Sequence, residues 1–271
     1  MGVTRNKNLV FGLVVLSALC CTLPVQANNA NSERVVEEFL VVKDPTVSNR
    51  DGWVFGLALE DYYMKSKLKI GSFDMPISVN MPGYSAWAAY GQFSILGSYK
   101  HGKGDAADSS LGSNVGTILH DFTINEYDVN LRWIVKALSA RHLSPYLLYG
   151  YSEREMVDNT KATISKYELI ATSTEKSNYF GGGAILPVTD AFGLRADYRY
   201  IKKMRGEFEM SDAFGKERDS YEKSYDVWTV SGYYNITKSI NLQAGVRRMS
   251  KFYWASEAQN GYSLAIGYVF R

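Results

Sequence analysis

The sequence has very little cysteine. Cys20 and Cys21 are the only two among 271 residues. Both fall in an N-terminal stretch that begins with two basic residues, continues with an apolar run over 9–19 and ends in small residues at Ala27. These are the features of a secretory signal peptide. We therefore expect residues 1–27 to be removed, so that no disulfide stabilises the remainder.

Long hydrophobic runs are also lacking. The apolar run over 9–19 is too short to cross a bilayer as a helix, which takes about 20 residues. No later stretch approaches that length. The sequence therefore predicts no membrane-spanning helix.

Net charge and catalytic motifs are scarce. The formal charge is +2, and Arg5 and Lys7 of the leader account for it. The remainder is neutral, which argues against nucleic acid as a partner. No phosphate loop, dinucleotide fingerprint or serine nucleophile elbow occurs, so we expect no cofactor, no resident metal and no enzymatic activity.

Alternation of apolar and polar residues is abundant instead. In "INLQAGVRR" (240–248) and "AFGLRADYRY" (191–200), every second residue is apolar while the residues between them are small, polar or charged. A period of two with one apolar face is typical of β-strands. Tyrosine is also frequent, with 20 residues, and collects where an apolar surface meets water.

We predict an all-β chain of about ten strands, although eight or twelve are compatible with the pattern. Proline at 76 makes the second strand the weakest. The predicted strands cover 52–64, 67–79, 84–100, 120–136, 143–154, 167–186, 191–209, 220–235, 239–252 and 260–270.

The predicted connections alternate in length. Short turns at 137–145, 186–191 and 235–239 alternate with longer polar loops at 101–119, 154–166, 210–219 and 253–259. Short periplasmic turns and longer extracellular loops are typical of closed, antiparallel, up-and-down transmembrane barrels. A soluble β-sandwich shows the same alternation, but the aromatic residues at both ends of the apolar stripes favour the barrel.

The chain therefore divides into three parts: a signal peptide (1–27), a periplasmic N-terminal segment (28–51) and a transmembrane β-barrel (52–271). The middle part, as a loose tail or as a short helix, would lie at the periplasmic mouth.

The faces opposite the apolar stripes carry charges of both signs. Because buried charges must be paired, we predict a charge network in a narrow lumen. The same residues could line either a filled interior or a small polar pore. The predicted network comprises Glu126, Asp128, Arg132, Arg195, Asp197, Arg199 and Arg247.

Histidine offers one route to catalysis. His101 and His120 flank a polar loop, and Asp121 follows His120. A His–Asp pair at a barrel rim could activate water. A strand would, however, point His120 and Asp121 to opposite faces.

The C-terminal stretch "YSLAIGYVFR" places large apolar residues at alternate positions: Tyr262, Leu264, Ile266, Tyr268 and Phe270. With the signal peptide and the hairpins, this ending resembles the bacterial outer-membrane β-barrel proteins. The resemblance implies location in the outer membrane, contact with its lipids and lipopolysaccharide, and recognition of the last strand by the barrel-assembly machinery. Arg271 departs from it, because the aromatic residue usually comes last.

The ten-strand count is similar to that of outer-membrane proteases of the omptin type. Neither His101 nor His120 fits the pattern of that family, so its activity does not carry over.

We expect a porin-like or structural surface protein that passes or binds a small solute. One alternative is a surface adhesin whose loops 101–119, 154–166 and 210–219 contact a host surface ligand. The other is a rim protease or lipid A hydrolase using His101, His120 and Asp121.

Overall fold

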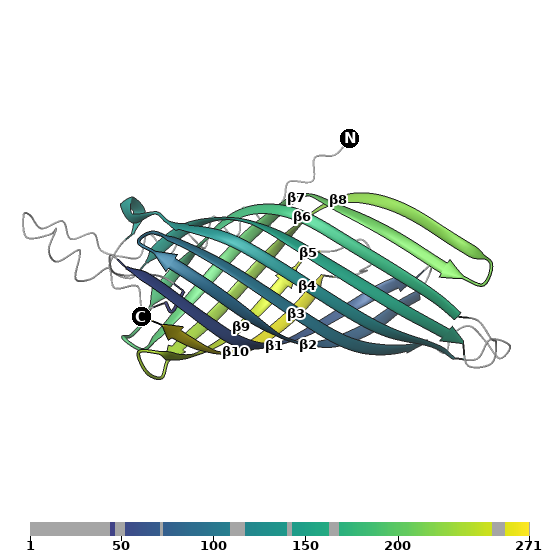
Figure 1. Cartoon of the computed structure of the whole chain (residues 1–271), viewed down its shortest axis with the longest axis horizontal. Helices are drawn as coiled ribbons and strands as arrows, with labels where there is room; N and C mark the ends of the chain where they lie inside the picture. Colours follow the sequence, from purple (N-terminus) through teal and green to yellow (C-terminus); the bar gives the residue numbers. More distant parts are fainter. Residues whose placement is uncertain are drawn as a thin grey trace, which may run out of the picture. The chain divides into compact units, whose positions relative to one another are not determined.

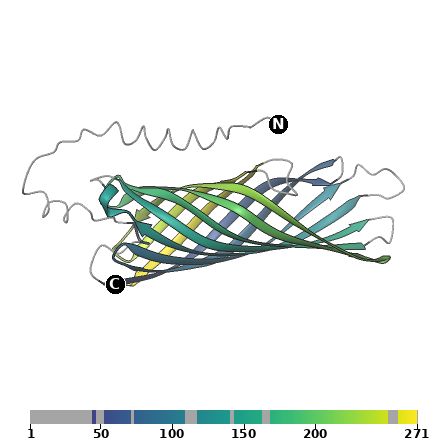
Figure 2. The same cartoon turned by 90° about the horizontal axis from the view of Figure 1, so that it is seen from above.

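The computed structural model describes residues 44–46, 52–70, 73–108, 117–139, 143–162, 168–250 and 258–270. The described part contains ten antiparallel strands that form one closed barrel (Figures 1 and 2). The strands are β1 (Trp53–Ile70), β2 (Phe73–Tyr90), β3 (Phe93–Asp108), β4 (Ile118–Ile134), β5 (Ser144–Ala162), β6 (Glu168–Pro187), β7 (Phe192–Asp212), β8 (Gly215–Asn235), β9 (Ile240–Met249) and β10 (Gln259–Phe270), with one 3-10 turn, η1 (Lys136–Leu138).

The barrel closes where β1 pairs with β10. The register runs from Phe55 opposite Phe270 to Lys65 opposite Asn260. Closure leaves no free strand edge, which is a requirement for a sheet that crosses a membrane. The ten-strand barrel is therefore confirmed.

None of the helices in the described residues has both the length and the apolar character needed to cross a membrane.

Two aromatic girdles surround the outer face. One ring lies at the end with the short turns and includes Trp53, Tyr90, Phe93, Trp133, Phe192, Tyr234 and Phe270. The second lies further along the strands and includes Tyr84, Tyr99, Tyr127, Phe180, Tyr198, Trp228 and Tyr262. Exposed aliphatic side chains such as Leu57, Leu131 and Ile266 lie between the rings. An apolar band flanked by aromatic girdles is the outer surface of a transmembrane barrel.

Short turns at one end identify the periplasmic side of the barrel. The β2–β3 turn is formed by Gly91 and Gln92, and Gly91 has a φ of 56°, which an L side chain rarely adopts. The first strand begins and the last strand ends at this same side (Figure 1).

The strands are much longer than the membrane requires. β7 and β8 have 21 residues each, whereas a membrane strand needs about 9–11. Their hairpin, in green, reaches the end of the barrel opposite the periplasmic turns (Figure 1). About half of each long strand therefore projects beyond the outer girdle.

Several predicted boundaries were wrong for this reason. Residues 101–108 continue β3, 154–162 continue β5, and the predicted loop 210–219 is a hairpin whose turn is residues 213–214. The projecting parts lose the apolar stripe because their outer face meets water instead of lipid. The remainder of loops 101–119, 154–166 and 253–259 lies largely outside the described residues.

The first hairpin was also placed wrongly. Residues 65–66 and 80–83, predicted as connections, lie inside β1 and β2. Pro82 interrupts the β2–β3 ladder, which passes from Asn80–Lys103 directly to Gly83–Lys100 and then continues to Tyr90–Phe93. Proline has no N–H to donate, so it weakened the strand pattern without ending the strand.

The depth of the apolar band can be tested on β5. Leu147 faces outward inside the band, and Val157 faces outward beyond the outer girdle. We expect Leu147→Arg to lower the free energy of unfolding by about 2–4 kcal/mol, because it places a charge in lipid. Urea titration in lipid vesicles measures the effect.

Val157→Arg is the matched control, because Val157 lies on the same strand as Leu147 and on the same face of it. It should leave stability nearly unchanged. Equal losses at the two positions would place the lipid boundary elsewhere.

Candidate functional site

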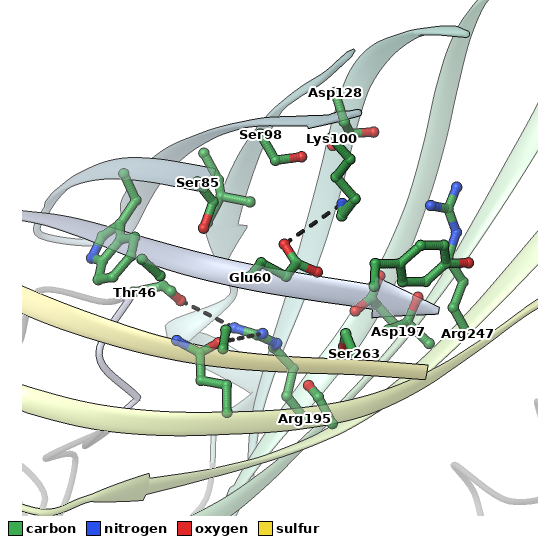
Figure 3. Close-up of a pocket in the computed structure, with 18 of the residues that line it drawn as sticks. Thr46, Glu60, Ser85, Ser98, Lys100, Asp128, Arg195, Asp197, Arg247 and Ser263 are labelled. Carbon is green, nitrogen blue, oxygen red and sulfur yellow. Dashed lines mark hydrogen bonds and ion pairs between the residues drawn. The ribbon is translucent and has the colours of Figure 1, made fainter. Parts of the chain in front are cut away.

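The structure brings all seven predicted lumen residues together. Their side chains point inward and line one cavity of about 130 Å³ in the periplasmic half of the barrel (Figure 3). The cavity has room for only a few water molecules, since each takes about 30 Å³ in the liquid. The role of the network remains a prediction.

Glu126 is the centre of the upper part of the network. It is 4% exposed, and both of its oxygens bind arginines. Arg247 Nη1 donates to one oxygen at 2.6 Å, and Arg154 donates to the other through Nη2 at 2.5 Å and Nε at 3.2 Å. Arg154 also donates to Gln259 at 3.3 Å. Through the two arginines, the Glu126 carboxylate therefore links β4, β5, β9 and β10.

Arg199 is the centre of the lower part. Its Nη1 lies 3.2 Å from Asp128 Oδ2, and its Nε lies 3.1 Å from Asp197 Oδ1. Tyr179 donates its hydroxyl to Asp128 Oδ1 at 2.9 Å. Charge-assisted hydrogen bonds of this kind compensate part of the cost of burying the charges.

The segment before the barrel enters the same site. Residues 44–46 are buried in the lumen. Asp44 Oδ2 lies 3.4 Å from Arg195 Nη1, and Thr46 Oγ1 accepts from Arg132 at 3.3 Å and from Arg195 at 3.4 Å. Part of the predicted periplasmic segment 28–51 thus lies inside the barrel. Its other residues, and the predicted signal peptide, lie outside the described residues.

Sequence reasoning missed several lumen residues. Arg154 stands where the predicted strand 143–154 meets the predicted loop 154–166, and the facing of that strand was left open because both of its faces carry aromatic residues. Lys100, whose Nζ lies 3.6 Å from Glu60, was not recognised either. Glu175 accepts a hydrogen bond from the Tyr221 hydroxyl at 2.7 Å, further from the periplasm.

Lumen aromatic residues explain why the sequence did not indicate which face of β5, β6 and β8 points into the lumen. Tyr146, Tyr179 and Tyr233 face inward, so both faces of their strands carry aromatic rings. Each ring lies over a glycine of another strand: Gly183, Gly150 and Gly193, respectively. A side chain at these glycines would collide with the ring. A glycine opposite a tyrosine on the adjacent strand therefore indicates that the tyrosine faces inward. This pairing can be recognised only when the strand register is known.

Beyond the charge network most buried lumen side chains are apolar, and His120, Asp158 and Glu175 are buried among them. One cluster contains Tyr62, Met64, Ile77, Val79, Met81, Phe122 and Ile124. The upper part of a second cluster contains Ile201, Met204, Tyr225, Val227 and Met249. Phe122 and Met204 are both 0% exposed, so this level of the barrel is a packed core.

The proposed histidine constellation is not assembled. His120 faces the lumen, where its Nδ1 lies 2.9 Å from Asp158 Oδ2 and 3.1 Å from Thr160 Oγ1. His101 and Asp121 face outward, and His101 Nδ1 lies 2.8 Å from Asn125 Oδ1. His120 and Asp121 lie on opposite faces of β4, as the period of a strand predicted, so the alternative trio is not brought together. The acidic partner of His120 comes from the adjacent strand.

Within the described ranges, no three His, Cys, Asp or Glu side chains are grouped so that they could hold a metal ion.

The predicted assembly residues form the outer face of β10. Tyr262, Leu264, Ile266, Tyr268 and Phe270 are 48–62% exposed. The rings of Tyr268 and Phe270 pack edge to face at 4.9 Å. Their recognition during assembly remains a prediction, and Arg271 lies outside the described residues.

Comparison with known proteins supports the fold. No protein-family model and no curated protein matches the sequence. The solved structure of the outer membrane protease OmpT from Escherichia coli matches with a TM-score of 0.52 and 13% identity, over 81% of this chain and 97% of that chain.

Two other solved structures match with lower TM-scores. The translocator domain of autotransporter NalP from Neisseria meningitidis has a TM-score of 0.49 and 10% identity, over 89% of this chain and 95% of that chain. Ail of Yersinia pestis has a TM-score of 0.35 and 11% identity, over 79% of this chain and 98% of that chain. At these identities the likeness concerns the fold. The closed barrel, with its apolar band and aromatic girdles, has the fold of an outer-membrane β-barrel.

The importance of Glu126 can be tested by removing its charge. Glu126→Gln leaves Arg154 and Arg247 buried without their shared carboxylate, which should cost about 3–5 kcal/mol of unfolding free energy. Adding Arg247→Met should recover part of the loss, because it removes one unpaired charge. Urea titration followed by tryptophan fluorescence measures both.

Glu168→Gln is the control, because Glu168 pairs with Lys161 while both side chains are more than 60% exposed. It should cause no measurable change. A similar loss in the two variants would contradict a buried role for Glu126.

Proposed function

We propose that this protein is a non-conducting outer-membrane barrel that acts as a surface-binding platform. Its lumen is filled to hold the wall rigid, and its extracellular strands present a binding surface above the membrane. The observation that carries the proposal is the packed apolar core inside the barrel beyond the outer girdle.

The filled lumen argues against the porin-like alternative. A solute crossing the barrel would have to pass both the charge network around Glu126 and the apolar level around Phe122 and Met204. Ten strands lie near the narrow end of the range, where side chains fill the interior, while open channels occur at about 16–18 strands.

The projecting hairpin of β7 and β8 supports a binding role. Its outer pairs include Lys216 with Glu209 at 2.6 Å, Arg205 with Glu222 at 3.6 Å, and Arg218 with Glu207. Such exposed pairs add little stability. They make the surface polar enough to stand in water as a continuous sheet.

The tip of this hairpin carries an exposed aromatic residue. Phe214 is 92% exposed, while Asp212 Oδ1 accepts from the backbone N–H groups of Phe214 and Gly215 at 2.8 and 3.0 Å. A large ring held in water on a fixed turn is an anchor of the kind that interfaces use. We assign it to contact with a ligand on a host or phage surface.

The proposal also assigns a surface of the barrel to the membrane lipids and to the assembly machinery. The girdles contact outer-membrane lipid and lipopolysaccharide, and the outer face of β10 is the part that the barrel-assembly machinery reads. No enzymatic activity is proposed, because His101, His120 and Asp121 do not meet on one face.

Single-channel recording tests the closed lumen. We expect the folded protein to give no conductance steps in planar bilayers. Phe122→Ala combined with Met204→Ala and Arg247→Ala should produce steps, because it opens both the apolar level and the charge network. Phe214→Ala, which lies outside the lumen, serves as the control and should not. Steps from the unchanged protein would remove the platform proposal in favour of a pore.

Binding by the hairpin tip is tested on whole cells. Cells displaying the protein should adhere to epithelial monolayers, or adsorb phage, more than cells without it. Phe214→Ser should reduce this binding by about tenfold, the loss of roughly 1.4 kcal/mol of contact. Val188→Ser, which removes an exposed apolar residue from a periplasmic turn, is the control. Equal binding by the Phe214 variant and the unchanged protein would contradict the assignment.

A further inference from the structure

The cavity in the periplasmic half of the lumen has an unusual occupant. Asp44, Pro45 and Thr46 come from the segment before the barrel, and each bonds to a side chain that lines the cavity. Thr46 is itself part of the lining (Figure 3). The Asp44 side chain is fully buried. Its carboxylate is bound to the barrel wall through one arginine, with 3.4 Å between Arg195 Nη1 and Asp44 Oδ2.

The segment is held like a ligand. The wall donates to it from Arg132 and Arg195, and from the Trp87 indole to the Pro45 carbonyl at 2.8 Å. The remaining bonds of Asp44 stay within the segment, since its Oδ1 accepts from the Thr46 backbone N–H at 2.8 Å and the Thr46 hydroxyl at 2.6 Å. The arginine contacts of 3.3–3.4 Å are at the long end for hydrogen bonds, so each is weak.

The wall of the cavity has an excess of positive charge without this segment. Among the described residues, five cationic and four acidic side chains line it. These are Lys100, Arg132, Arg195, Arg199 and Arg247, and Glu60, Glu126, Asp128 and Asp197. The carboxylate of Asp44 supplies the fifth negative charge.

Donor capacity also remains unused. In the described part of the chain, the buried Nε atoms of Arg132, Arg195 and Arg247 have no hydrogen-bond partner. A buried unpaired donor is costly, and it marks a place where an acceptor is expected. Carboxylates and phosphates are the acceptors that match the planar fork of arginine.

The position of the cavity makes it reachable from the periplasm. Arg132 is two residues from the periplasmic end of β4, and Arg195 and Trp87 are each three residues from the corresponding ends of β7 and β2. The buried clusters that contain Phe122 and Met204 lie on the other side of the cavity.

We propose that this pocket binds a small periplasmic anion that carries a carboxylate or phosphate group, and that Asp44 is its built-in competitor. In the absence of the anion, the segment lies along the cavity and its Asp44 carboxylate pairs with Arg195. When the anion binds, its oxygens replace the Asp44 carboxylate at Arg195, and the segment leaves the lumen. The barrel then changes its periplasmic mouth in response to a ligand while its surface platform stays unchanged.

Thiol labelling tests the displacement. Cys20 and Cys21 are the only cysteines, so Pro45→Cys in a Cys20→Ala, Cys21→Ala background gives a single buried thiol. Pro45 contacts Trp87 through its backbone carbonyl, which the substitution keeps. Inorganic phosphate should raise the maleimide-labelling rate at least fivefold over sodium chloride at equal ionic strength.

Two further substitutions make the test specific. Adding Asp44→Asn should give fast labelling without phosphate, because the competitor has lost its charge. Adding Arg195→Gln should also speed labelling and should abolish the response to phosphate. Asp190→Asn, in an exposed periplasmic turn, is the control and should change neither.

Direct binding supplies an independent readout. By isothermal titration of the detergent-solubilised full chain, Asp44→Asn should bind phosphate about tenfold more tightly than the unchanged protein. Equal affinities in the two, no binding in either, or a phosphate response that persists with Arg195→Gln would each overturn the proposal.

Discussion

The structure depends on one buried carboxylate that holds two arginines. Glu126 lies inside a closed barrel and binds Arg154 and Arg247 with both oxygens. Each of these charges alone would be very costly at that depth. Together they connect strands on different parts of the wall. The contacts that neutralise the buried charges therefore also hold these strands in place around the lumen.

The need for such a core follows from the length of the strands. A barrel that ended at the outer girdle would be supported by lipid over most of its height. This one continues far beyond it, where water lies outside the wall and contributes no lateral support. The level around Phe122 and Met204 supplies an interior core there, much as in a soluble β-protein.

Much of the fold could be predicted from the sequence because lipid imposes a simple rule. Where the wall faces the membrane, the period of two is clean, and the outward row of β10 and the inward charges around Asp128 were assigned correctly. Beyond the membrane that rule no longer applies. The predicted loop 154–166 therefore began at Arg154, although β5 continues as a paired strand to Ala162.

The remaining misses have a common physical cause. Lumen tyrosines such as Tyr179 resemble girdle residues until their facing glycines are aligned, and alignment depends on register. His120 contacts Asp158 on the adjacent strand, a partner that no local pattern identifies. Likewise, no local pattern indicates that Asp44 reaches Arg195. Contacts between residues distant in sequence decide each case.

Amide hydrogen exchange in lipid vesicles tests the central claim most directly, namely that the barrel beyond the membrane is a rigid, filled extension of the part within it. Backbone amides of β4 near Phe122 should be as strongly protected as those near Leu131, because both levels are packed from inside. Fast exchange near Phe122, with slow exchange confined to the apolar band, would contradict the account.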